Sequence, residues 1–141
     1  MLHAVSTFQF KSRLEELLIF GLTAITNLLS SDTDMKIQER ISEMFIHIQS
    51  KKARQCLASG LHRCYQTKTT QILLDMNTVK KGQADVEYDY DRVLNGIQQI
   101  KTVDCDRNVL VYCLLSLMQH QEYSLREYAL HALTQQLGEI G

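Results

Sequence analysis

The stretch that decides the fold is Leu125-Arg126-Glu127-Tyr128-Ala129-Leu130-His131-Ala132-Leu133. Its apolar residues recur at steps of three and four, which places them on one face of an α-helix. Ser124 and Glu127 have the S-x-x-E spacing of a capping box, and Gly138 suits a C-cap. The segment therefore predicts a helix over 124–138 whose inward side chains are Leu125, Tyr128, Ala129, Ala132, Leu133 and Leu137.

A similar pair of helices occurs earlier in the chain. Residues 22–48 read LTAITNLLSSDTDMKIQERISEMFIHI, and residues 111–137 read VYCLLSLMQHQEYSLREYALHALTQQL. In both, an apolar helix ends in Leu-Leu or Leu-Met, a short polar turn follows, and an aliphatic residue, then Gln or Arg, then Glu opens the second helix. Ile37 and Leu125 occupy equivalent places 88 residues apart, which is twice 44 and fits a helical-repeat period of roughly 40–47 residues.

Residues 125–133 resemble the second helix of a HEAT or armadillo repeat, in which an aliphatic-Arg start leads to small alanines where neighbouring helices approach closely. The resemblance implies an all-α fold of antiparallel helix pairs, stacked as a short, right-handed HEAT/armadillo-like solenoid of about three units and about seven helices. The units would cover 12–49, 51–101 with a loop at 78–88, and 107–138 of one helical-repeat domain spanning 1–141. The same pattern also suits a piece of a longer protein. A compact bundle of helices without a repeat would show the same amphipathic periods.

The remaining helices follow from the same period. Ser12-Arg13-Leu14-Glu15 repeats the capping-box form, and Asp32-Thr33-Asp34 is a second start signal. Further helices are expected at 51–65, at 67–77, from Asp89 or Asp91 to 101, and from Asp106 to 118, with a loop at 78–88. Gly60 would weaken its helix by up to about 1 kcal/mol relative to Ala. The first helix should bury a stripe made of Leu14, Leu17, Leu18, Leu22, Ile25, Leu28 and Leu29.

The amino-acid composition supports a helical fold and indicates the compartment in which the protein works. Proline is absent, which favours uninterrupted helices, and 45% hydrophobic with 22% charged residues is ordinary for a globular chain. No apolar run is long enough to span a membrane. The four cysteines show no C-x-x-C spacing and sit mostly among apolar residues, as free thiols do. We expect a reducing compartment, the cytoplasm or the nucleus.

Charge is segregated although the net charge is only −1. Residues 51–81 contain seven Lys or Arg and one acid, Asp75, whereas residues 82–106 contain six Asp or Glu against Arg92 and Lys101. A basic segment favours an acidic peptide or helix as partner, or nucleic acid, since clustered Lys and Arg bind phosphates. Alternatively it is a solvated face or pairs with the acidic 85–106 stretch. The candidate binding residues are Lys51, Lys52, Arg54, Arg63 and Lys68.

Two tyrosines, Tyr88 and Tyr90, alternate with acids in Glu87-Tyr88-Asp89-Tyr90-Asp91. The segment fits a partner-binding edge or a phosphorylation site at a helix start. It also fits a helix cap whose tyrosines pack on the neighbouring helix. We include both tyrosines among the candidate partner-binding residues.

No catalytic, metal or cofactor motif stands out. The five histidines are scattered, and the paired acids lie at expected helix starts, where capping explains them. The sequence therefore predicts no enzyme and no cofactor, but a protein–protein interaction scaffold that binds a partner peptide or helix, or neighbouring repeats. A nucleic-acid-binding repeat that uses residues 51–81 is the alternative. Polar residues of the second helices should add contacts: Gln38, Arg40, Glu43, His47, Arg126, His131 and Gln135.

Overall fold

The computed structural model describes residues 7–30, 35–81, 86–119 and 123–140, and these residues contain helices and loops but no strand. The all-α prediction is confirmed for them. The elements are α1 (Thr7–Asn27), α2 (Met35–Ser42), the 3-10 helix η1 (Glu43–Ile46), α3 (Lys51–Tyr65), α4 (Lys68–Met76), α5 (Tyr90–Thr102), α6 (Arg107–Leu117) and α7 (Tyr123–Ile140).

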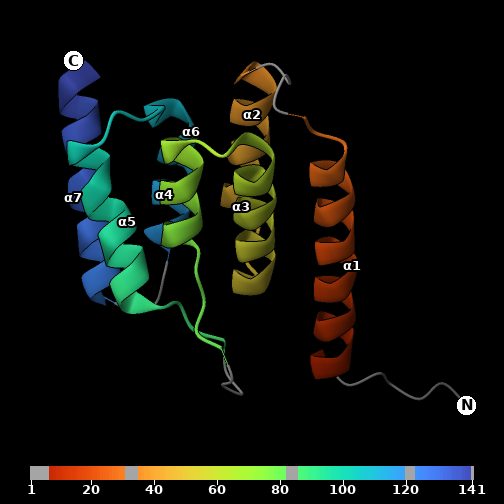
Figure 1. Ribbon diagram of the computed structural model, residues 1–141. Coiled ribbons are helices and arrows are strands. Elements are labelled where there is room, and N and C mark those ends of the chain that lie inside the picture. The colour runs from red at the N-terminus through yellow and green to blue at the C-terminus, as the bar shows by residue number, and fades with distance from the viewer. Residues whose placement is uncertain (1–6, 31–34, 82–85, 120–122, 141) are drawn as a thin grey trace, which may run out of the picture.

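The helices form two layers (Figure 1). In one layer α1 packs on α3, α3 on α4, and α4 on α5; in the other, α2 and η1 pack on α6, and α6 packs on α7. The layers meet where α4 contacts α6 and α5 contacts α7. The contacts cross the boundaries of the expected units, since α1 packs on α3 and α2 packs on α6. The three units and the handedness of a solenoid therefore stay predictions.

Short polar side chains fix most of the helix starts. The side chains of Asp89 and Asp106 accept hydrogen bonds from backbone N–H groups at the starts of α5 and α6, as the sequence predicted. Ser50 caps α3, and Thr67 and Thr70 form a capping box on α4. The proposed start signal at 32–34 lies outside the described residues.

The predicted bounds of the first and last helices and the capping roles at those bounds are wrong; α7 begins at Tyr123, so Ser124 lies within it rather than before it. Helix α1 begins at Thr7, so Ser12 lies within it, and Glu15 instead accepts a hydrogen bond from the Ser50 hydroxyl at 2.6 Å. At the other end of the chain, α7 runs to Ile140 and passes through Gly138. The spacing of a capping box is a weak signal for a helix end, because Ser, Glu and Gly also occur in helix interiors.

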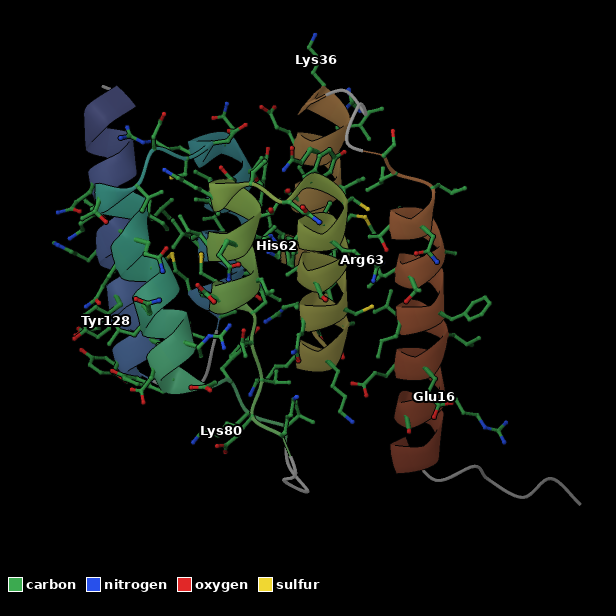
Figure 2. All side chains as sticks on the ribbon, in the orientation of Figure 1. Glu16, Lys36, His62, Arg63, Lys80 and Tyr128 are labelled. Carbon is green, nitrogen blue, oxygen red and sulfur yellow. The ribbon has the colours of Figure 1, made fainter. Side chains whose placement is uncertain are left out.

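One continuous core connects the layers. Its largest fully buried side chains include Phe45, Leu57, Leu61, Ile72, Leu114 and Leu125, and of the inward residues expected in the last helix Leu125, Ala129, Ala132 and Leu133 are buried. The predicted inward stripe of α1 is wrong in most of its members, because within it only Leu22 is fully buried. Tyr128, expected inside, is 41% exposed on α7, at the edge of the molecule in Figure 2. The side chain of Leu137 is outside the described part of the chain.

The expected loop between α4 and α5 is confirmed where the chain is described, that is, outside 82–85. Its two arms run antiparallel: the Lys80 N–H donates to the Glu87 carbonyl and the Asp89 N–H donates to the Thr78 carbonyl, both at 2.8 Å. We refer to residues 78–81 and 86–89 as the anchored loop. Among the described helices, none has both the length and the apolar content needed to cross a membrane.

Candidate interaction surfaces

Two predicted binding residues, Arg54 and Tyr88, are buried and bond to each other. Arg54 Nη1 donates to the Tyr88 hydroxyl at 2.7 Å, and Arg54 Nε donates to the Ile48 carbonyl. Arg54 is only 6% exposed and Tyr88 only 4%. Burial raises the pKa of Tyr88, while the Arg54 charge opposes this rise. These residues fasten the anchored loop to the start of α3, so they offer no surface to a partner.

The accessible Lys and Arg residues of segment 51–81 lie near the two opposite ends of α3. Lys51 Nζ is 3.4 Å from the Val86 carbonyl oxygen and 5.5 Å from the centre of the Tyr88 ring, so Lys51 lies beside the anchored loop. Lys52, Lys80 and Lys81 are exposed at this same end, and we call these four lysines the lysine end.

Arg63 lies at the opposite end of α3, roughly 17 Å from Lys52 at 1.5 Å per helical residue. It points toward α1, where its Nη2 donates to Asn27 Oδ1 at 3.2 Å (Figure 2). Lys68 begins α4, just after the end of α3, and is exposed. The structure therefore divides the basic segment between two ends rather than gathering it into one patch.

In the described part of the chain, no ion pair links the acidic segment to the lysines of the basic segment. An ion pair joins Arg92 Nη2 to the buried Asp75 carboxylate at 2.9 Å, and Arg92 Nε also donates to it. Asp75 is the one acid of the basic segment, and Arg92 is one of the two basic residues of the acidic segment. This ion pair therefore uses the single acid of the basic segment and a basic residue of the acidic segment. It covers none of the four lysines of the lysine end.

Tyr90, the last of the predicted residues, is half-buried and lines a surface groove of about 620 Å³ between α5 and α7. Ser124, Glu127, Tyr128 and His131 supply much of the α7 side. The Glu127 carboxylate accepts a hydrogen bond from the Tyr123 hydroxyl at 2.6 Å, which fixes its position at the groove. Of the polar positions named from the sequence, Gln38 is buried, while Arg40, Glu43, His47, Arg126, His131 and Gln135 are exposed.

An exposed apolar surface on α1 was not expected from the sequence. Leu28 is 86% exposed, Leu17 68% and Leu14 50%, and Leu18 and Ile25 are more than one-third exposed. At 100° per residue these side chains form a single stripe along α1, with Gly21 in its middle. We call this set, with Gly21, the α1 stripe. The sequence identified its residues as one face of a helix but predicted that this face was buried.

The α1 stripe is exposed because α3 packs against a different side of α1. Leu22 and Thr26 are buried there, and Gly60 of α3 faces Thr26 so closely that an added Cβ would lie 2.6 Å from Thr26 Oγ1. Cys64 Sγ lies 3.1 Å from the Thr26 carbonyl oxygen, within hydrogen-bonding distance. Helix α1 therefore has two apolar sides, one against α3 and one in solvent.

The described residues contain no group of three or more metal-ligating side chains placed to hold a metal ion. Burial raises the pKa of the Cys113 thiol to about 12, which keeps this thiol protonated and inert at neutral pH.

A comparison with protein families gives one match. The family model described as "U3 small nucleolar RNA-associated protein 20, N-terminal" matches residues 14–140, nearly the whole chain. The chain belongs to this family. No curated protein and no solved structure matches it. Because the match to this U3 small nucleolar RNA-associated protein 20 family begins at Leu14, the α1 stripe and the lysine end both lie within the family's domain.

Proposed function

We propose that the chain is a non-catalytic, HEAT-like scaffold segment that holds a partner protein through the α1 stripe, within an assembly that contains U3 small nucleolar RNA. The single observation that carries the proposal is the exposure of five large aliphatic side chains along one helix. Contiguous apolar surface of this kind marks interaction sites in folded proteins, because its exposure is otherwise unfavourable. The family description supports the RNA-containing context, and with it a nuclear location.

A scaffold role fits the polar residues as well. The acids at Asp89 and Asp106 serve as helix caps, Asp75 is neutralised by Arg92, and the buried pair Arg54–Tyr88 holds a loop in place. Each of these residues has a structural task. This division of tasks supports binding rather than catalysis as the role of the domain.

A second candidate function is direct RNA binding by the lysine end. Lys52, Lys80 and Lys81 are exposed on neighbouring segments, and the RNA in the family's description makes phosphate a relevant ligand. Affinity from this source would fall steeply as salt is added, because each neutralised phosphate releases counterions. Arg54, Tyr88 and Tyr90 would take no part.

Affinity purification of the tagged chain from cells, with and without nuclease, separates the two functions. One variant, Leu17→Lys with Leu28→Lys, removes apolar surface from the α1 stripe. Leu130→Lys is the matched control, since Leu130 is a 49% exposed leucine on α7. A third variant, Lys52→Glu with Lys80→Glu and Lys81→Glu, reverses charge at the lysine end.

The proposed function predicts that a protein is recovered after nuclease treatment, that the α1 variant loses it, and that Leu130→Lys keeps it. Recovery of RNA that only the charge-reversed variant loses would favour the second function. Equal recovery of the protein by the wild-type chain and the α1 variant would refute the proposal. Far-UV circular dichroism of each variant checks that the helices remain.

A further inference from the structure

The two layers of the fold differ in length. One layer contains α1, α3, α4 and α5, and the other contains α2 with η1, α6 and α7. In the described part of the chain, α4 faces α6 and α5 faces α7, whereas α1 packs mainly on α3 at one side of the stack (Figure 1). Among the described helices, α1 is therefore a member of its layer without a main counterpart in the other.

The position of the α1 stripe matches this missing counterpart. At 100° per residue, the centre of the α1 stripe lies roughly 110° around the helix from the side that Leu22 and Thr26 present to α3. A helix in a two-layered stack contacts one neighbour in its own layer and another in the opposite layer, so it needs two apolar sides at about this angle. We propose that the α1 stripe seats one amphipathic α-helix of a partner protein, which would complete the end of the stack. This inference rests on the proposed function and names the occupant of its site.

The spacing within the stripe is that of helix-on-helix packing. Leu14, Gly21 and Leu28 recur every seven residues, as do Leu18 and Ile25. A seven-residue repeat keeps a seam facing a second helix that runs nearly along the first. At Gly21 an added Cβ would meet no atom within 4 Å, so the seam has an open notch between larger side chains. A side chain of the partner helix fits that notch as a knob.

The electrostatics of the stripe select the partner's chemistry. The sequence from Leu17 to Ser30 contains no charged residue. An acidic peptide or a phosphate backbone gains nothing from such a surface, whereas the apolar side of an amphipathic helix does. We therefore infer that binding at the stripe is insensitive to salt, unlike binding at the lysine end.

The size of the stripe argues against a second copy of this chain as the occupant. A stable protein–protein interface typically uses about 20–30 residues on each side. Six residues along α1 are too few for a symmetric dimer formed by the stripe alone. They suit one helix of a partner that makes its remaining contacts elsewhere.

Photocrosslinking tests the occupant directly. Leu14 and Leu28 are replaced, one at a time, by p-benzoylphenylalanine, and the residues that crosslink in the purified assembly are identified by mass spectrometry. Glu16 is the control position, because it is exposed on a different side of α1 (Figure 2). Leu14 and Leu28 are about 21 Å apart along the helix.

A partner helix predicts crosslinks within one segment whose position shifts by about 14 residues between the two probes, since both helices rise 1.5 Å per residue. An extended partner segment would shift by only about six residues at 3.3 Å each, and would overturn the helix. Crosslinks to a second copy of this chain, or to another part of the same protein, would also overturn the partner helix. The Glu16 control is expected to give no crosslink to the partner. If the probes at Leu14 and Leu28 give none either, the proposed function itself fails.

A salt titration of the crosslinking yield adds a second readout. Raising the salt from about 0.1 M to 1 M shortens the Debye length from about 10 Å to 3 Å. The yield at Leu14 and Leu28 is expected to change less than about twofold, because the seam is uncharged. A loss of tenfold or more would mean that charge holds the partner, and would overturn the inference.

Discussion

Replacing Gly60 by alanine is expected to destabilise the fold, whereas the same replacement at Gly21 is expected to stabilise it. Both glycines lie within helices, Gly60 in α3 and Gly21 in α1. An added Cβ at Gly60 would lie 2.6–2.7 Å from three atoms of Thr26, but at Gly21 it would meet nothing within 4 Å. The two positions thus differ in the space around them and not in their secondary structure.

The magnitudes follow from two opposing effects. Alanine is favoured over glycine in a helix by about 0.8–1.0 kcal/mol at either position. At Gly60 the close contact with Thr26 forces α1 and α3 apart, and overpacking of this kind costs about 1–3 kcal/mol. We expect Gly21→Ala to gain about 0.5–1 kcal/mol and Gly60→Ala to lose up to about 2 kcal/mol. Because the propensity gain is common to both, the difference between the variants measures the close approach of α1 to α3.

Urea unfolding followed by circular dichroism measures both free energies of unfolding. The double variant Gly60→Ala with Thr26→Ala adds a control, because it removes two of the three close atoms, Thr26 Oγ1 and Cγ2. The free energy of unfolding lost in this double variant should be smaller, by about 0.5 kcal/mol or more, than the summed losses of Gly60→Ala and Thr26→Ala alone. Equal stabilisation by Gly60→Ala and Gly21→Ala would refute the tight α1–α3 contact.

Two further predictions concern buried polar groups. Tyr88→Phe leaves a buried Arg54 N–H without the acceptor now at 2.7 Å and should cost about 1–3 kcal/mol, whereas Tyr90→Phe should change stability by less than about 0.5 kcal/mol in the same urea assay. Burial raises the pKa of Cys113 from 9.0 to about 12, so between these values the unfolded chain loses the thiol proton that the folded chain keeps, and stability falls as pH rises. The stability of Cys113→Ala relative to the wild-type chain should therefore improve by up to about 1 kcal/mol between pH 8 and 10, and a constant difference would contradict the raised pKa.

Local signals in the sequence were enough to place most helices. Asp89 and Asp106 could be predicted as caps because a capping side chain bonds to backbone only two or three residues away. The loop at 78–88 follows from a missing period in the same way. The local signal was misleading at Ser12, which does not cap a helix with Glu15. The partner of Glu15 is the hydroxyl of Ser50, the N-cap of α3, and no local sequence pattern can reveal such a contact.

Burial could not be predicted as well, because it depends on which neighbour a helix meets. The apolar period of α1 correctly marked a face, yet α3 approaches through Gly60 and packs against Thr26 instead. Tyr88 misled for a different reason. Its sequence context left open both a partner-binding edge and a tyrosine packed inside; in an extended segment successive side chains point to opposite sides, and here Tyr88 turns inward while Glu87 remains outside.

The two candidate surfaces bind through different forces and are made of different residues. The lysine end depends on charge and stands on a loop that the Arg54–Tyr88 hydrogen bond fastens to α3. The α1 stripe has no charge between Leu17 and Ser30 and depends on apolar contact alone. The two surfaces share no residue. Helix α1 meets α3 through Leu22 and Thr26, which belong to neither surface. If both proposed functions hold, a partner protein at the α1 stripe and RNA at the lysine end would respond differently to salt, which should weaken RNA binding alone.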